Sequence, residues 1–276
     1  MVVDSTADLP DELANDPNIT VVPLTVLFGD EAYLDWVDMG PEEFYERLKV
    51  APELPRTSQP SAGAFLERYK SLRERFERVY SVHLSGKFSG TVASAEVARA
   101  QVDGVKVVDS LLTTGGTALL AERMLARLDR GIEEEELDAY IEHFLKDKVF
   151  YFLPTTLDQL HKGGRIGKAS HLVGTLLNIK PVLTIDDGII DVYKKVRGTR
   201  QALEAMRDGI VENTDPGSTL YCSLSHGLNE PVYNQMRELL GEIKDRDLQI
   251  KVVNIVGAVI GTYVGPGALA LGCIQE

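Results

Sequence analysis

The alternation of short β-rich runs with helical patterns constrains this chain more than any other feature of its sequence. In the first half, a run of β-branched and aromatic residues is followed three times by a polar loop and a helical pattern. The three units cover residues 2–13, 78–101 and 105–130. Strands that alternate with helices imply right-handed crossovers and a parallel sheet. Because ligands bind beyond the carboxyl ends of such strands, the three polar loops mark the edge where we expect a site.

The segment between the first two units predicts an insertion into this pattern. Residues 19–38 indicate a β-hairpin that turns at Gly29-Asp30. Residues 41–49 indicate a short helix, and residues 51–60 an extended, proline-rich loop.

From Val149 the pattern changes to strands mixed with hairpins and helices. We expect strands at 149–153, 180–185, 189–196, 218–224 and 250–256, and helices near 157 and at 169–178, 199–213 and 229–244. The sequence Asp186-Asp187-Gly188 between two apolar runs is typical of a hairpin turn. We therefore predict an α/β protein with two domains. An N-terminal domain (1–148) would have a parallel sheet flanked by helices, and a C-terminal α+β domain (149–276) a mixed or antiparallel sheet.

Charge disfavours several classes of partner. The formal net charge is −13, which repels phosphate backbones and anionic lipid head groups, so we expect neither nucleic-acid binding nor stable membrane insertion. Residues 252–275 carry no charge and are long enough to span a bilayer. Their five glycines and Pro266 favour a buried strand, a tight turn and a close-packed helix instead. No secretory leader opens the sequence, so we expect a cytoplasmic protein.

The two cysteines, Cys222 and Cys273, are far apart and flanked by apolar or small residues. This spacing is not that of a metal site or a CxxC redox pair. We expect two buried free thiols in a reducing compartment rather than a disulfide.

The sequence contains parts of several catalytic motifs, but each of them lacks required residues or spacing. Residues 161–170 (HKGGRIGKAS) resemble a P-loop, but Lys162 stands where the first glycine belongs and Ala169 where a hydroxyl belongs. Residues 86–90 (GKFSG) lack the spacing of a nucleophile elbow. The histidines do not show metal-ligand spacing. A hydrolase or phosphotransferase that uses Ser89 or Ser5 remains an alternative, and it needs a base from elsewhere in the chain.

Hydroxyl clusters at strand-to-helix turns are the more informative feature. Ser89-Gly90-Thr91 opens one predicted helix, and Thr57-Ser58 precedes another that begins near Ala62. Free backbone N–H groups at helix starts, beside hydroxyls, suit a single anionic head group. The simpler alternative is that these residues only cap their helices. Neutral donors suit retention of a carboxylate better than bond cleavage.

A set of motifs spread over nearly the whole chain resembles the DegV family. They occur in the family's order: 4–10 (DSTADLP), 57–61 (TSQPS), 84–91, 108–110 (VDS), 160–166 (LHKGGRI), 180–183 (KPVL), Arg197 and 261–267 (GTYVGPG). The resemblance implies a two-domain protein without a cofactor that binds a long-chain fatty acid, such as palmitate, stearate or oleate, in a tunnel. It also implies a partner, an ATP-dependent fatty acid kinase related to dihydroxyacetone kinases, which phosphorylates the presented carboxylate for phospholipid synthesis.

The resemblance also assigns residues. Thr57 and Ser89 would hold the carboxylate, with Ser58 and Gly90 beside them, while Arg165 and Arg197 would face the opening or the kinase. Ordinary surface arginines are the alternative for the last two. A regulatory module that senses lipid is a further alternative to the kinase role.

The chain departs from the family pattern in two places. Tyr263 stands where many members have histidine, so we expect it near the head group with different hydrogen bonding. The turn after Ser110 reads Thr113-Thr114-Gly115-Gly116 rather than the usual Ser-x-Gly-x-Gly. Only three residues precede Asp4, so we expect a first strand with a truncated start.

Overall fold

The computed structural model describes residues 1–174 and 179–276. Its first half forms a parallel sheet in the order β2-β1-β6-β7. These strands are β2 (Thr20–Val22), β1 (Val2–Asp4), β6 (Val79–His83) and β7 (Val105–Asp109). Every residue of β1 and β6 is buried, as expected for a parallel sheet covered on both faces. The predicted parallel sheet flanked by helices is confirmed.

The second sheet is mixed. Its order is β10-β9-β8-β13-β11-β12, with only the β11–β12 pair parallel among the described strands. These strands are β8 (Val149–Leu153), β9 (Lys180–Asp186), β10 (Ile189–Val196), β11 (Thr219–His226), β12 (Asp247–Ile255) and β13 (Leu269–Gln275). The hairpin predicted at Asp186-Asp187-Gly188 joins β9 to β10, with both Asp187 and Gly188 at positive φ. The predicted C-terminal mixed sheet is confirmed.

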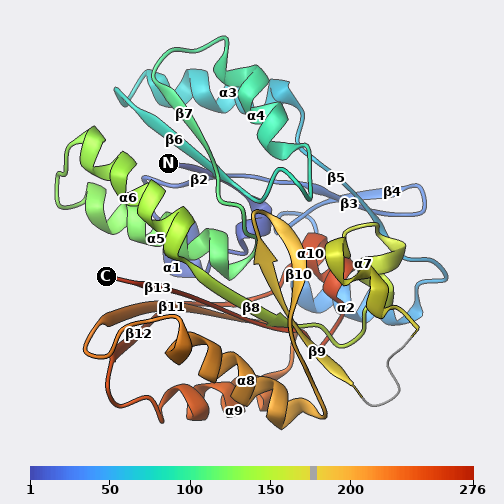
Figure 1. Cartoon of the computed structure of the whole chain (residues 1–276). Coiled ribbons are helices and arrows are strands. Elements are labelled where there is room, and N and C mark those ends of the chain that lie inside the picture. The colour runs from blue at the N-terminus through green and yellow to red at the C-terminus, as the bar shows by residue number, and fades with distance from the viewer. Residues whose placement is uncertain (175–178) are drawn as a thin grey trace.

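Helices separate and cover the two sheets, as Figure 1 shows. The pair α3 (Ala62–Arg73) and α4 (Thr91–Arg99) covers the outer face of the parallel sheet, and α8 (Thr199–Glu212) with α9 (Glu230–Leu240) covers the outer face of the mixed sheet. Between the sheets lie α5 (Gly115–Leu128) and α6 (Glu134–Asp147). Since α5 contacts both β6 and β11 to β13, the two halves share a buried layer. The division at residue 148, between α6 and β8, stays a proposal.

A small third sheet lies beside this stack. Its order is β4-β3-β5, made of β3 (Thr25–Phe28), β4 (Glu31–Leu34) and β5 (Arg56–Ser58). The predicted hairpin is confirmed over β3 and β4, and Gly29 at its turn has φ +60°, a conformation that suits glycine. The first part of the predicted hairpin, residues 20–22, is instead β2 of the parallel sheet. The stretch predicted as an extended loop contributes β5, which pairs with β3. The helices α2 (Pro41–Val50) and α10 (Ala258–Val264) pack together against this region.

The shorter helical elements follow β1 and β8. They are η1 (Ser5–Ala7), α1 (Asp11–Ala14), α7 (Asp158–Lys162) and η2 (Gly167–Leu172). The helix expected at 169–178 is replaced over residues 167–172 by the 3₁₀ turns of η2. The part of that prediction at 175–178 lies outside the described residues.

The final strand, β13, contradicts the prediction for the C-terminal segment. Residues 252–275 were expected to form a strand, a turn and a helix; they form the end of β12, then α10, then β13. β13 is paired on both sides and buried from Leu269 to Ile274. Its Leu, Ala and Gly residues show neither the polar alternation nor the β-branched and aromatic content that identify a strand in a sequence.

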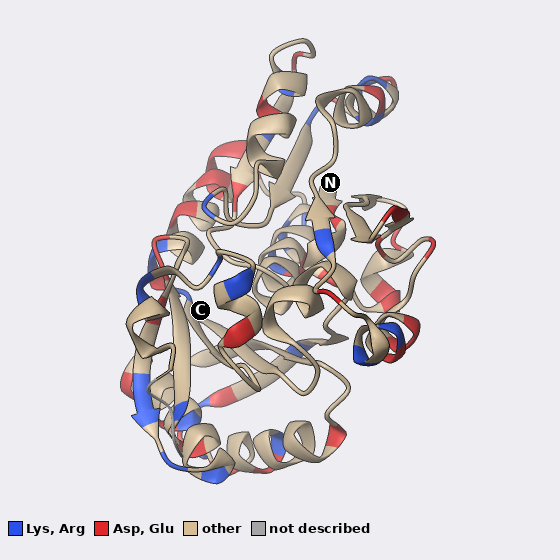
Figure 2. Ribbon diagram, turned by 90° about the vertical axis from the view of Figure 1, so that its right-hand side faces the viewer, with Lys and Arg blue, Asp and Glu red and all other residues tan. Residues whose placement is uncertain are grey.

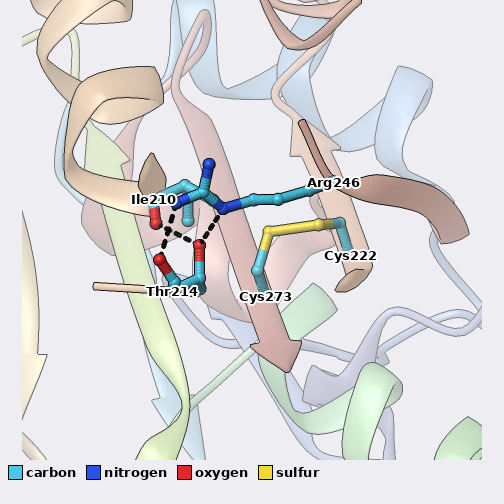
Figure 3. The surroundings of a disulfide bond; sticks show 5 residues. All are labelled: Ile210, Thr214, Cys222, Arg246 and Cys273. Atoms are coloured by element: carbon cyan, nitrogen blue, oxygen red, sulfur yellow. Dashed lines mark hydrogen bonds between the residues drawn. A yellow bond between two sulfur atoms is a disulfide. The ribbon is translucent and has the colours of Figure 1, made fainter. Parts of the chain in front are cut away.

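The expectation of two free thiols is also wrong, because Cys222 and Cys273 form a disulfide. The cysteines face each other in the antiparallel pair of β11 and β13, with their Cα atoms 4.2 Å apart. Both are buried, as expected. Figure 3 shows the neighbouring Arg246, whose guanidinium donates to the hydroxyl and carbonyl oxygens of Thr214. Only the position of β13 brings the two cysteines together, and that position was not predicted.

Lys, Arg, Asp and Glu residues are spread over the helices, the loops and parts of the strands, as the colours of Figure 2 show. Glu134, Glu135 and Glu136 lie in the first turn of α6, where negative charge suits the helix dipole. Among the described residues, no helix has the length and apolar character needed to cross a membrane.

Candidate functional site

An apolar cavity of about 240 Å³ lies where the carboxyl edge of the parallel sheet meets the mixed sheet and α10. An engineered apolar cavity of about 150 Å³ already admits benzene, so this space is large enough for a longer apolar group. Its apolar lining comes from β8, β9, β10, β13, α7, α10 and the segments before β3 and after β6. These side chains are Leu24, Leu84, Phe88, Phe150, Phe152, Leu160, Ile185, Ile190, Val256, Val259, Ile260, Val264, Ala268, Leu269 and Ala270.

The loops after β6 and β7 line this cavity, as the parallel-sheet prediction required. Leu84 and Ser89 come from the first loop, and Thr113 and Thr114 from the second. The loop after β1 does not line it. There the Ser5 hydroxyl donates to Asp35 Oδ2 at 2.7 Å, and Asp35 Oδ1 accepts the amide of Ala258 at the start of α10. This third loop therefore positions α10, which forms part of the wall.

One end of the cavity carries polar side chains that are half-buried or exposed, and we call this end the mouth. It consists of Thr57, Ser58, Gln59, Ser89, Arg165 and Tyr263. Thr57 lies on β5 and Tyr263 on α10, and their hydroxyl oxygens are 2.6 Å apart. Two neutral hydroxyls from segments 206 residues apart thus meet at one point of the mouth.

Ser89 lies just before α4, in the loop that follows β6. Its Oγ is 2.9 Å from Thr91 Oγ1 and accepts the Thr91 amide at 3.3 Å. Ser89 therefore bonds the first amide of α4 from the position before the N-cap residue Gly90, and it also lines the cavity. Gly90 does not line the cavity but lies beside it, since a Cβ at this position would collide with the side chain of Gln59.

Arg165 supplies the positive charge at the mouth. Its Nε donates to the Phe88 carbonyl at 3.2 Å and its Nη1 to the Gly163 carbonyl at 2.6 Å. The guanidinium lies 5.1 Å from the centre of the Tyr263 ring, within the range of a cation–π contact. These contacts hold the charge beside the hydroxyls of Thr57 and Tyr263.

Arg197 lies elsewhere. It follows β10, is exposed, and lines a second cavity together with residues such as Thr155 and Lys180. The structure thus brings Thr57, Ser58, Ser89, Tyr263 and Arg165 together at one mouth, places Gly90 next to it, and does not bring Arg197 there.

A buried Ser–His–Asp arrangement occurs, but it is not at the cavity. Ser81 Oγ is 2.7 Å from His83 Nε2, and His83 Nδ1 is 3.0 Å from Asp4 Oδ2. All three side chains have no exposure, and Ser81 accepts the hydroxyl of Tyr69 at 2.7 Å. A nucleophile needs access to its substrate, so this chain of hydrogen bonds joins β1, β6 and α3 rather than providing a catalytic triad.

The serines of the hydrolase alternative do not meet a base either. Ser5 is 2% exposed, and its hydroxyl donates to the Asp35 carboxyl and accepts the amide of Leu24. The described contacts of the Ser89 hydroxyl are those with Thr91. Within residues 1–174 and 179–276, no group of His, Cys, Asp or Glu is arranged to hold a metal ion. The geometry of the described site suits binding better than bond cleavage.

Sequence reasoning missed two acidic side chains that hold α10 in place. Asp8 Oδ1 accepts the Trp36 indole at 2.9 Å and the Gly257 amide at 3.0 Å, while Asp35 accepts Ser5 and Ala258. Burial raises the pKa of Asp35 to about 7, and burial together with the nearby Asp35 raises the pKa of Asp8 well above its ordinary range. Asp8 belongs to the DSTADLP motif, which was the only signal in the sequence for either residue.

Comparison with known proteins places these features in a family. The model of a family described as "Uncharacterised protein, DegV family" matches residues 1–276. A Thermotoga maritima protein named fatty acid-binding protein is 36% identical over 280 residues, which cover 99% of this chain and 96% of that relative. These matches extend over the cavity and its mouth as well as the sheets.

Solved structures agree with this result. A DegV family protein from Thermus thermophilus, described by its fatty acid binding, is 33% identical with a TM-score of 0.95, covering 100% of this chain and 98% of that one. A stearic acid-binding protein from Eubacterium ventriosum is 27% identical with a TM-score of 0.87, covering 99% and 97%. These relatives are named for binding a fatty acid and not for a catalysed reaction.

Proposed function

The chain belongs to the DegV family, and from this premise we propose that it binds one long-chain fatty acid, such as palmitate, stearate or oleate, in the cytoplasm. The observation that carries the proposal is an apolar cavity whose mouth presents uncharged hydroxyls and one arginine. The alkyl tail would occupy the cavity and the carboxylate the mouth. No cofactor is needed for this role.

The carboxylate would be held by Thr57, Ser89 and Tyr263, with Ser58 and Gly90 beside them. Thr57 and Tyr263 are hydrogen bonded to each other, so one of these two hydroxyls has its proton free for a carboxylate oxygen, and the Ser89 hydroxyl can donate a second bond. Tyr263 stands where many family members have histidine, and a phenol donates without bringing a positive charge. Arg165 is therefore the cation that we assign to the head group, and its contacts with Phe88 and Gly163 keep it at the mouth.

The energetics favour retention of the ligand. A sixteen-carbon tail buries about fourteen methylenes, roughly 11 kcal/mol of transfer free energy at about 0.8 kcal/mol each. Ordering and association offset much of this. A buried carboxylate without hydrogen bonds would cancel the remainder, which is why the hydroxyls at the mouth matter.

We test this role with the purified protein and its ligand. Denaturing mass spectrometry should release a long-chain fatty acid, and delipidated protein should bind added stearate. The variant Thr57→Ala/Ser89→Ala should bind stearate at least tenfold more weakly, since each lost bond to a charged group is worth about 1.5–3 kcal/mol. Isothermal titration calorimetry measures this difference.

The control is Ser71→Ala, a hydroxyl removed from an exposed position on α3, which should leave stearate affinity unchanged. An empty protein that does not bind added stearate or oleate would contradict the proposal. Equal affinity of the double variant and the wild type would remove Thr57 and Ser89 from the site.

We further propose that the bound acid is presented to an ATP-dependent fatty acid kinase related to dihydroxyacetone kinases, which forms the acyl-phosphate used in phospholipid synthesis. Support comes from the exposure of Arg165 and Arg197, two cations on a chain of net charge −13. Arg197→Ala should lower the rate of acyl-phosphate formation severalfold and leave stearate affinity unchanged, because Arg197 is remote from the mouth.

Phosphate transfer from labelled ATP to bound stearate measures this rate, with Arg200→Ala as the control because Arg200 is also exposed and pairs with Glu204 on its own helix. Wild-type protein that binds stearate but gives no acyl-phosphate with such a kinase would favour the alternative, a regulatory module that senses lipid.

A further inference from the structure

Among residues 1–174 and 179–276, two threonine hydroxyls in the cavity wall have no hydrogen-bond partner at ordinary bonding distance, although one of them lies close to the carboxyl of Asp8. Thr113 and Thr114 follow β7 and line the cavity, and their Oγ1 atoms are both buried and unpaired. Thr114 as a residue is 3% exposed. Since buried polar atoms in folded proteins are nearly always hydrogen bonded, two adjacent unpaired hydroxyls on the wall of a ligand cavity point to a missing partner.

The backbone of Thr114 supports this interpretation. Its φ of 45° with ψ of −134° is a rare conformation for a β-branched residue, and such strained residues cluster at ligand sites. Thr114 occupies the N-cap position of α5, yet its side chain does not cap the helix. A threonine at an N-cap usually bonds an amide of the first turn. Here the hydroxyl remains available to the cavity.

The carboxyl group of Asp8 lies close enough to the Thr114 hydroxyl to accept its proton. Asp8 Oδ2 is buried without a hydrogen-bond partner. Burial raises the pKa of Asp8, and the Thr114 hydroxyl is among the groups that lower it, so the two groups are close. A hydroxyl that rotates to donate to Asp8 keeps its lone pairs as acceptors. Thr113 still has its proton to donate. Together the two threonines offer one acceptor and one donor, which matches the hydrogen bonding of an alcohol.

We propose that Thr113 and Thr114 form a subsite for a hydroxyl group on the acyl chain, so that this protein prefers long-chain hydroxy fatty acids. The subsite presupposes the fatty-acid binding proposed above. A plain methylene chain would leave the Thr113 proton and the Thr114 acceptor unused on binding, whereas a ligand hydroxyl would satisfy both. Thr113 and Thr114 come from the loop after β7, which contributes no side chain to the mouth, and Thr114 is buried, so the ligand hydroxyl belongs on a carbon beyond the carboxylate end of the chain.

The affinities of stearate and of hydroxystearates with the hydroxyl at successive carbons test the proposal. In the wild-type protein, one mid-chain isomer should bind about tenfold more tightly than stearate, the equivalent of about 1.4 kcal/mol. The hydroxyl of this isomer would bond the two threonines, whereas a methylene of stearate leaves their polar atoms without a partner. The control ligand is 2-hydroxystearate, whose hydroxyl stays beside the carboxylate and should give no such gain.

Matched variants assign the gain to the two threonines. Thr113→Val/Thr114→Val keeps the side-chain shape, so it should bind stearate at least as tightly as the wild type and lose the preference. Thr113→Ser/Thr114→Ser keeps both hydroxyls and should retain the preference.

Wild-type protein that binds stearate but shows no mid-chain preference overturns the subsite alone. A preference that survives in the valine variant also overturns it. If no acid binds, the proposed function fails, and the subsite with it.

Discussion

At the scale of single residues, two carboxyl groups meet inside the protein where α10 begins. Asp8 and Asp35 both accept backbone amides at this point, from Gly257 and Ala258. Both have raised pKa values, chiefly through burial. These carboxyls connect the first loop of the parallel sheet to a helix that lines the cavity, so their ionisation affects the stability of the site as well as of the fold.

We expect Asp35→Asn to change how stability depends on pH. The pKa of Asp35 is about 7 in the folded protein and about 3.9 in an unfolded chain. Between these values the folded state binds more protons than the unfolded state, so wild-type stability falls as pH rises through this window. The amide of the variant carries no charge and should reduce this fall, which urea unfolding at about pH 5, 6, 7 and 8 measures.

Asp30→Asn, at an exposed turn, is the control and should follow the wild-type curve. The same pH dependence in Asp35→Asn and wild type would show that Asp35 is already ionised without penalty. Asp8 loses a like-charged neighbour in the variant, which adds to the expected change.

At the scale of elements, the disulfide fixes β11 against β13. Cys222 and Cys273 are 51 residues apart, and closing a loop of this length stabilises a fold by roughly 4 kcal/mol in the chain-entropy description. We expect Cys222→Ala/Cys273→Ala to lower the unfolding free energy by up to about 4 kcal/mol. Urea unfolding with and without a reductant measures this loss.

The reductant should lower the stability of the wild type but leave that of the double variant unchanged. Alkylation of the native, unreduced protein should find no free thiol when it is unfolded without reductant. Two alkylated cysteines, together with a wild-type stability that reductant does not alter, would contradict the disulfide.

Elements also differ in how well the sequence predicted them. β1, β6, β7, β8, β10 and the β3–β4 hairpin appear where β-rich runs and turn residues indicated them. β13 was missed because its residues are mostly Leu, Ala and Gly, with Ile274 as its one β-branched residue, and such a composition does not identify a strand. β5 was missed because three residues in a proline-rich stretch form a strand only through pairing with β3.

At the scale of the whole molecule, the two sheets share one hydrophobic core, and the cavity lies where the carboxyl edge of the parallel sheet meets the mixed sheet and α10. The hydrophobic core that contains Val82 and Val108 of the parallel sheet continues into Phe150 and Phe152 of the mixed sheet. Figure 1 shows α5 between the sheets, with α10 next to their meeting edge. The mouth therefore combines β5, the start of α4 and α10, which lie far apart in the sequence.

The sequence alone determined the positions of most strands and helices, the parallel and mixed sheets, and the polar loops at the carboxyl edge. These features depend on local periodicity and turn chemistry, which neighbouring residues carry. Tertiary structure alone decided that Thr57 meets Tyr263, that Cys222 pairs with Cys273, that Arg197 lies apart from the mouth, and that Thr113 and Thr114 have unpaired hydroxyls. Each of these depends on packing between distant segments, and local sequence patterns do not encode which distant side chains meet.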